Sequence, residues 1–220
     1  MWHKEYARAT HRWSPLPSFY PGDAFALRIG HPVKAWRALR NPLMDASSLD
    51  RLRSAIRDVP DFPQPGVLFK DITPVLADSA LLTLAVDGMA AVADGQRVDK
   101  VVGIDARGFI FGAMLAARIG CGFIPARKKG KIPWRTSGVD YALEYGTASL
   151  EIHEDAIKPG ERVLLADDLL ATGGTAGAAL ELITRTGAEF LGSVFFIELA
   201  FLKGRERVAK YGPVNALLTF

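Results

Sequence analysis

The central part of the chain alternates between almost continuously apolar segments and segments with helical periodicity. VDKVVGID (98–105), RVLLADD (162–168) and EFLGSVFFIEL (189–199) are apolar over most of their length. Apolar residues at helical spacing follow the first two segments, at 108–120 and 175–187. Apolar strands separated by helices are typical of a parallel sheet that is covered on both faces. The pattern therefore predicts an α/β doubly wound fold, which binds ligands at the carboxyl ends of its strands.

The segment before this alternation predicts two helices and a loop. Ser47 or Ser48 is a candidate N-cap for a helix that ends before Pro60. Apolar spacing predicts a second helix over 79–93. Between them, PDFPQPGVLFKDITP (60–74) contains four prolines and a glycine. This composition excludes a regular helix and predicts an ordered loop with a short strand.

A polar segment interrupts the alternation after a strand predicted at 121–126. RKKGKIPWRTSGVDYALEYGTASLEIHED (127–155) begins with cations, glycine and proline and continues into the alternating sequence ASLEIHE at 148–154. Alternation of apolar and polar residues is typical of a strand. We therefore expect a flexible loop followed by a β-arm.

The net charge of +3 is unevenly distributed along the chain. Residues 1–43 hold seven of the 27 Lys and Arg residues but two of the 24 acids, which leaves 20 basic and 22 acidic residues for 44–220. The first 43 residues also lack apolar periodicity, so we expect a basic, poorly ordered N-terminal extension and a single domain over 44–220. Met44 is a candidate for the natural start. A basic arm suits nucleic acid, but the absence of a recognisable nucleic-acid-binding motif argues against that partner.

Several protein classes are disfavoured by what the sequence lacks. No apolar run reaches the roughly 18 residues of a membrane-spanning helix, and the first residues have no apolar signal-peptide core. Cys121 is the single cysteine, and no group of Cys and His has zinc-site spacing. These features predict a cytoplasmic protein without a membrane partner.

The stretch VLLADDLLATGGTAG (163–177) contains the strongest candidate site. Asp167 and Asp168 stand where the strand is expected to end, and ATGGT (171–175) stands where the next helix is expected to begin. The start of a helix offers free backbone N–H groups, and glycine lets a phosphate approach them closely. Ionised carboxylates accept hydrogen bonds from a pair of ribose hydroxyls. Each half alone also suits an ordinary turn or a solvated strand end, but the combination indicates a ribose 5-phosphate site.

Other phosphate-binding motifs do not fit this stretch. It lacks the lysine of the G-x-x-x-x-G-K-[ST] loop and the G-x-G-x-x-G spacing of a dinucleotide site. Two acids followed by ATGGT instead resemble the motif with which type I phosphoribosyltransferases bind 5-phosphoribosyl 1-pyrophosphate (PRPP). Further motifs are similar to those of the adenine phosphoribosyltransferases, in the same order: DFPQPGVLFKDITP, GIDARGFIFG, RKKGKIP, YALEYG and LKGRERV. The resemblance covers the body from about Asp45 to Val208.

The resemblance implies a fold, a reaction and partners. The fold is that of the type I phosphoribosyltransferases, a mostly parallel twisted sheet flanked by helices, with a small hood (60–72) over the base and a flexible β-arm loop. The reaction converts adenine and PRPP to AMP and pyrophosphate in purine salvage, with Mg²⁺ carried mainly by the pyrophosphate. A homodimer is also implied.

The resemblance assigns roles to individual residues. PRPP and AMP would contact Asp167, Asp168 and the loop residues Ala171, Thr172, Gly173, Gly174 and Thr175. The pyrophosphate would contact Asp105, Ala106 and Arg107, together with the cations Arg127, Lys128 and Lys131. The Asp105–Ala106 peptide bond is expected to be cis. Glu144 would manage the proton of the purine, with Tyr145 beside the ribose, and both are catalytic candidates together with Arg107.

The base itself would be bound by Leu68, Phe69 and Lys70, in part through backbone groups. The human-type enzyme has Val and Arg where this chain has Leu68 and Lys70, and recognition through backbone groups tolerates these changes. Phe69 is also a candidate for the core. Two alternatives stay open at this point. One is a phosphoribosyltransferase for another purine base, and the other is a PRPP-binding transcriptional regulator of the same fold.

Overall fold

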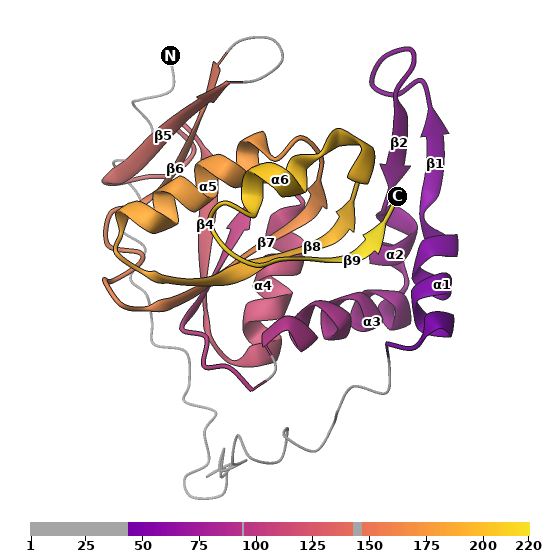
Figure 1. Cartoon of the computed structure of the whole chain (residues 1–220), viewed down its shortest axis with the longest axis horizontal. Coiled ribbons are helices and arrows are strands. Elements are labelled where there is room, and N and C mark those ends of the chain that lie inside the picture. The colour runs from indigo at the N-terminus through magenta and orange to yellow at the C-terminus, as the bar shows by residue number, and fades with distance from the viewer. Residues whose placement is uncertain (1–43, 94, 143–146) are drawn as a thin grey trace, which may run out of the picture. The chain divides into compact units, whose positions relative to one another are not determined.

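The computed structural model describes residues 44–93, 95–142 and 147–220 (Figure 1). A seven-stranded sheet has the strand order β5-β6-β4-β3-β7-β8-β9, and β1 and β2 form a separate two-stranded hairpin. The strands are β1 (Arg57–Pro60), β2 (Leu68–Asp71), β3 (Lys100–Ile104), β4 (Gly122–Lys128), β5 (Thr136–Ala142), β6 (Thr147–His153), β7 (Arg162–Leu170), β8 (Glu189–Glu198) and β9 (Val214–Thr219). The helices are α1 (Ala46–Ala55), α2 (Thr73–Ala77), α3 (Ser79–Ala90), α4 (Gly108–Ile119), α5 (Gly174–Arg185) and α6 (Gly204–Val208), with 3₁₀ turns at Ala91–Ala93 and Ala200–Leu202.

The predicted doubly wound parallel sheet is confirmed. β4, β3, β7, β8 and β9 are parallel neighbours, whereas β6 and β5 extend the sheet as antiparallel strands. β6 contains the alternating sequence of the predicted β-arm, whereas β5, which pairs with it, lies in the segment that was predicted as a loop. β3 and β7 are adjacent, so the loops that follow them emerge at the same edge of the sheet.

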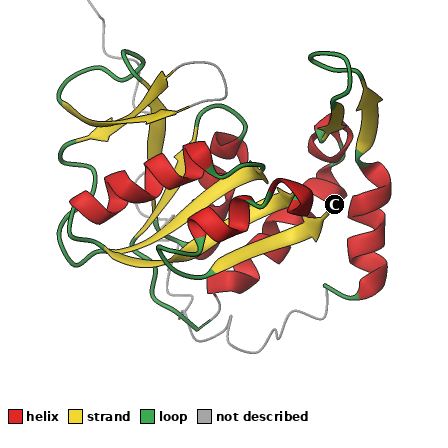
Figure 2. Ribbon diagram, turned by 45° about the horizontal axis from the view of Figure 1, so that its top comes forward, coloured by secondary structure: helices red, strands yellow, loops and turns green. Residues whose placement is uncertain are grey.

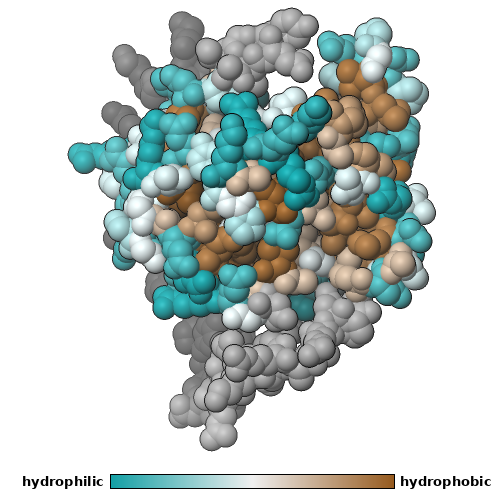
Figure 3. Space-filling model, in the orientation of Figure 1, coloured by the Kyte–Doolittle hydropathy of each residue, from teal (hydrophilic) through white to brown (hydrophobic). Residues whose placement is uncertain are grey.

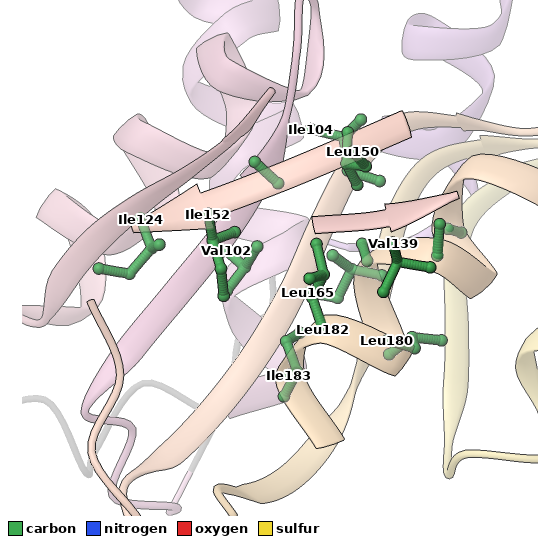
Figure 4. Close-up of a cluster of buried hydrophobic side chains, with 14 of the residues drawn as sticks. Val102, Ile104, Ile124, Val139, Leu150, Ile152, Leu165, Leu180, Leu182 and Ile183 are labelled. Carbon is green, nitrogen blue, oxygen red and sulfur yellow. The ribbon is translucent and has the colours of Figure 1, made fainter. Parts of the chain in front are cut away.

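Helices cover both faces of the sheet because successive strand residues point to opposite sides. In β3, Val102 packs with Leu182 and Ile183 of α5, whereas Val101 packs with Phe111 and residues of α3 on the other face. Figure 2 shows the layers of helix, sheet and helix, and Figure 4 shows the side chains of the α5 layer. A chain with such buried strands must place its polar groups at the strand ends, where the candidate site lies.

The first helix ends before Pro60 as predicted but has a different N-cap. Asp45, rather than Ser47 or Ser48, is the N-cap, and its Oδ1 accepts a hydrogen bond of 2.8 Å from the backbone N–H of Ser48. The helix ends at Ala55 because Ile56 has an extended backbone, and the chain then enters β1. The region 60–74 consequently contributes to two paired strands and not to one.

Strand β7 is longer than its prediction. It continues through Asp167 and Asp168 to Leu170 because it stays paired with β8 as far as Glu198. The acids therefore belong to the last part of the strand and do not mark its end. Strand β9 and the short helices α2 and α6 were not predicted, since their apolar patterns are short. No helix among the described residues is long and apolar enough to cross a membrane.

Candidate active site

Two loops at the carboxyl edge of the sheet enclose a cavity of about 440 Å³. One loop follows β3 and leads into α4, and the other follows β7 and leads into α5. The cavity is lined by the predicted residues Asp105, Ala106, Arg107, Asp167, Asp168, Ala171, Thr172, Gly173, Gly174 and Thr175. Sequence segments 60 residues apart thus meet at one site, where a doubly wound sheet is expected to bind its ligand.

The loop after β3 holds its predicted backbone geometry. The Asp105–Ala106 peptide bond is cis, as expected from the resemblance. The backbone N–H of Asp105 donates to the carbonyl of Ala126 on β4 at 2.9 Å. The loop is therefore held to the neighbouring strand while Arg107 reaches into the cavity.

Arg107 joins the two loops. Its Nε lies 2.6 Å from Oδ2 of Asp168, and the Asp168 side chain is 10% exposed. The Arg107 guanidinium also lies 5.4 Å from the ring centre of Phe69 in the β1–β2 hairpin, within the range of a cation–π contact. One side chain thus touches the β7 carboxylate and the hairpin.

The two neighbouring acids have different surroundings. Oδ1 of Asp167 accepts a hydrogen bond of 2.9 Å from the backbone N–H of Asp168. A side chain at Gly108, the first residue of α4, would overlap that oxygen. Burial raises the pKa of Asp167 well above its usual range, and the negative charge of Asp168 raises this pKa further. Burial and the neighbouring charge therefore favour the protonated form of Asp167.

The loop before α5 has the geometry of an anion site. Gly173 has a φ of 75° and caps α5 without a side-chain hydrogen bond. The first residues of this 12-residue helix line the cavity together with Thr172, and the start of a helix carries free N–H groups and a partial positive charge. Gly204 packs behind the loop, where an added Cβ would overlap the carbonyl oxygen of Ala171 and lie 2.9 Å from the Gly173 nitrogen. Helix α6 therefore supports the loop from behind.

Residues 127–131, at the end of β4 and just after it, form a cationic turn that contacts the same site. Nε of Arg127 lies 2.8 Å from Oδ2 of Asp105, and its Nη1 donates to the carbonyl of Lys131 at 3.1 Å. Buried Glu151 of β6 accepts a hydrogen bond of 3.1 Å from the N–H of Gly130. Arg127 therefore connects the turn to the cavity loop, and Glu151 holds the turn to the β-arm. The side chains of Lys128 and Lys131 are exposed.

The three predicted base-binding residues lie on β2 of the hairpin. Phe69 packs edge to face with Phe62 at 5.2 Å between ring centres. Lys70 pairs with Asp58 at 2.6 Å, and Leu68 is 51% exposed. Figure 3 shows hydrophobic surface over this hairpin, where a flat apolar ligand would find contacts.

Two of the predicted catalytic residues, Glu144 and Tyr145, fall outside the described residues. Three residues that support the site were not predicted from the sequence. Gly204, Glu151 and Gly108 were missed, because a glycine in close packing or a buried acceptor becomes visible only when distant segments meet. Gly204 belongs to LKGRERV, a motif that resembles the family, but the resemblance did not assign it a role.

The carboxylates at the cavity suit a metal ion that enters together with a bound substrate. Among residues 44–93, 95–142 and 147–220, no group of three or more His, Cys, Asp or Glu side chains could hold a metal ion. Asp105 and Asp168 nevertheless place carboxylate oxygens at the cavity, and Mg²⁺ binds through one or two carboxylates together with phosphates of a substrate. The residues therefore fit a Mg²⁺ ion that arrives with a pyrophosphate.

Comparison with known protein families identifies the class of protein to which the chain belongs. The family model described as a phosphoribosyl transferase domain matches residues 76–217. This match, the doubly wound sheet and the cavity at its edge define the class as phosphoribosyltransferase.

Individual relatives identify the family within the phosphoribosyltransferases. A relative from Anaeromyxobacter dehalogenans, named adenine phosphoribosyltransferase, is 54% identical over 172 residues, which are 78% of this chain and 99% of the relative. One of the same name from Nitrosococcus oceani is 55% identical over 172 residues, 78% of this chain and 100% of the relative. The crystal structure of adenine phosphoribosyltransferase from Rhodothermus marinus has a TM-score of 0.77 and 51% identity, over 80% of this chain and 100% of that chain. The chain belongs to the adenine phosphoribosyltransferase family.

Proposed function

We propose that this protein transfers the 5-phosphoribosyl group of PRPP to adenine, which yields AMP and pyrophosphate in purine salvage. One observation carries the proposal. The glycine loop at the start of α5, the Asp168 carboxylate and the Arg107 guanidinium line a single cavity. These groups are the donors and acceptors that a phosphate, a ribose diol and a pyrophosphate require. The relatives do not favour a transcriptional regulator of the same fold.

The sugar phosphate would bind to the loop after β7. Backbone N–H groups from Ala171 to Thr175 and the hydroxyls of Thr172 and Thr175 would bind the 5′-phosphate at the start of α5. Asp168, supported by Asp167, would accept hydrogen bonds from the ribose hydroxyls. The raised pKa of Asp167 supports this division, because it favours the protonated form and so weakens the repulsion that a second carboxylate would exert on the phosphate.

The pyrophosphate would bind on the opposite side of the cavity. Asp105, Ala106 and Arg107 would contact it through the loop after β3, and Arg127, Lys128 and Lys131 would approach it from the cationic turn. Mg²⁺, when bound, would neutralise part of the pyrophosphate charge as the group leaves. The cations therefore compensate the charge that develops on the leaving group.

The base would bind beside the hairpin. Backbone groups of Leu68 and Lys70 would recognise adenine, with Phe69 at its edge. In the reaction, adenine N9 bonds to C1′ of the ribose as the bond from C1′ to the pyrophosphate oxygen breaks, and the N9 proton leaves. Glu144 would manage this proton, with Tyr145 beside the ribose, and the transition state would resemble an oxocarbenium ion. We further propose a cytoplasmic homodimer.

An incorporation assay tests the base. Purified protein is supplied with PRPP, Mg²⁺ and radiolabelled adenine, hypoxanthine or guanine, and the nucleotide product is separated and counted. We expect labelled AMP from adenine, no product when PRPP is left out, and far lower incorporation of the other two bases. Equal incorporation of hypoxanthine would contradict adenine as the preferred substrate.

A further inference from the structure

The β1–β2 hairpin is not part of the seven-stranded sheet, so side-chain contacts, together with its chain connections to α1 and α2, determine its position beside the cavity residue Arg107. Two cation–π contacts link it to the sheet. The first joins Arg107 to Phe69. In the second, Nζ of Lys70 lies 4.3 Å from the ring centre of Phe220, which follows β9. Figure 1 shows the end of β9 beside the hairpin.

Phe220 is itself firmly attached to the sheet. Its backbone N–H donates to the carbonyl of Glu198 at 2.9 Å, and its carbonyl accepts a hydrogen bond of 2.9 Å from the N–H of Ala200. The guanidinium of Arg53 in α1 also lies over the ring, 4.7 Å from its centre, and donates to the carbonyl of Thr219. The ring is thus a fixed point from which the hairpin can be held.

The other partner of Lys70 cannot supply this attachment. Asp58 stands directly opposite Lys70 on β1, so their ion pair connects the two strands of the hairpin with each other. The Asp58 side chain is also 54% exposed, and exposed ion pairs contribute little to stability. The Lys70 side chain is 12% exposed, which makes its contact with the Phe220 ring a partly desolvated one, and such contacts are the stronger cation–π interactions.

The alternation of side chains along β2 connects the Lys70–Phe220 contact with the proposed base site. Successive residues of β2 point to opposite faces, and Lys70 faces Phe220 whereas Phe69 faces Arg107. Fixing Lys70 on one face therefore fixes Phe69 and the backbone between them on the other. In the proposed function Arg107 also binds the pyrophosphate, whereas the contact between Lys70 and Phe220 does not involve Arg107.

We propose that Phe220 is a positioning residue for adenine recognition: its ring anchors Lys70, and through Lys70 it holds the base-binding strand β2 over the cavity. The proposal rests on the proposed function, since it assigns a role in binding the base. It predicts that the Phe220 ring affects the KM for adenine and leaves the KM for PRPP, which binds to the loops of the sheet, nearly unchanged.

Three variants and two measurements test the proposal. Phe220→Leu removes the aromatic ring, Phe220→Tyr keeps it, and Phe201→Leu changes a 71% exposed phenylalanine close by. Steady-state kinetics give the KM for adenine and for PRPP, and hydrogen–deuterium exchange follows the amides of 57–71 without any substrate. With Phe220→Leu we expect the adenine KM to rise about 3- to 10-fold and the PRPP KM to stay within about twofold. Exchange at 57–71 should accelerate, whereas the other two variants should resemble the wild type.

The outcomes separate this proposal from the proposed function. A wild-type protein that does not use adenine would overturn the proposed function, and the exchange of 57–71 would still decide whether Phe220 anchors the hairpin. Unchanged exchange in Phe220→Leu, equal damage in Phe220→Tyr, or exchange that accelerates across the whole sheet would overturn the anchor. Should Phe220→Leu fail to fold, Lys70→Met removes the same contact from the hairpin side, with Asp58→Asn as the control for the ion pair. Slow exchange at 57–71 in Lys70→Met would then refute the anchor.

Discussion

Nε of Arg107 lies 2.6 Å from Oδ2 of Asp168, so an ion pair spans the cavity between the loops after β3 and β7. In the proposed function the carboxylate binds a ribose diol and the guanidinium binds a pyrophosphate. PRPP carries both groups, so one molecule can replace the ion pair with two new contacts. An anion without a diol would have to separate Arg107 from Asp168 and leave the carboxylate without its partner, which is unfavourable.

The Asp168 carboxylate can be tested by Asp168→Asn. The amide loses the charge that accepts two hydroxyl donors and pairs with Arg107. We expect kcat/KM for PRPP to fall by about 10- to 100-fold or more, since hydrogen bonds to charged groups contribute about 1.5–3 kcal/mol, while the melting temperature changes little. Asp155→Asn, at an exposed turn, is the matched control. Wild-type activity in Asp168→Asn would refute the role in binding the diol.

The close packing of α6 against the loop before α5, the proposed site of the 5′-phosphate, makes Gly204→Ala informative. An added Cβ would overlap the carbonyl of Ala171 and displace the loop before α5. Small displacements of binding groups are costly in rate, so we expect kcat/KM for PRPP to fall about 10-fold or more. Gly138→Ala, where the new Cβ would meet its nearest atom at 3.4 Å, should keep its activity. Equal kinetics in both variants would show that the loop does not depend on α6.

Glu151 can be tested through its hydrogen bond to Gly130. Glu151→Ala leaves the Gly130 N–H without its acceptor and loosens the cationic turn that carries Lys128 and Lys131. We expect the KM for PRPP to rise about 3- to 10-fold, as the loss of one typical hydrogen bond predicts. Glu151→Gln keeps an acceptor oxygen and should stay close to the wild type, as should Glu154→Ala at an exposed position. An unchanged KM in Glu151→Ala would show that the turn is held by other contacts.

The raised pKa of Asp167 predicts a pH-dependent effect on stability. The folded protein keeps a proton on Asp167 at pH values where the unfolded chain has released it, so this residue lowers stability as pH rises from the ordinary Asp pKa of about 3.9 through the raised value. Asp167→Asn cannot ionise and keeps the acceptor for the Asp168 N–H. The melting temperature of the variant minus that of the wild type should therefore increase from about pH 5 to about pH 8. A difference that is constant with pH would contradict the raised pKa.

Glu144 lies outside the described residues, and its role stays a prediction from the resemblance. Glu144→Gln should lower kcat by about 10²- to 10⁴-fold, the usual contribution of general acid–base catalysis, with a modest change in the KM for PRPP. Steady-state rates at saturating adenine and PRPP measure this directly. An unchanged kcat would exclude Glu144 as the group that handles the proton.

The sequence was sufficient for the parts of the site that are local in the chain. The strand, turn and helix at Asp168 and Gly173, and the equivalent junction at Arg107, follow from patterns of a few residues, and adjacent parallel strands bring them together. Contacts between distant segments could not be predicted in this way. Gly204 behind the phosphate loop and Phe220 beneath Lys70 depend on how α6 and β9 pack. Local sequence patterns also gave the wrong end for β7, which pairing with β8 extends to Leu170. They gave the wrong N-cap for α1, which is Asp45 and not Ser47 or Ser48.

The separation of the β1–β2 hairpin from the seven-stranded sheet has a consequence for protein engineering. In the proposed arrangement, the groups that bind the sugar phosphate lie at the end of β7 and in the loop that follows it, whereas the groups that recognise the base lie on a two-stranded unit outside the sheet. Residues 57–71 could therefore be exchanged between relatives, as a cassette, to alter the preferred base while the sugar-phosphate half remains intact. The residues to keep in such a graft are the anchor points on the sheet side, Phe220 and Arg107.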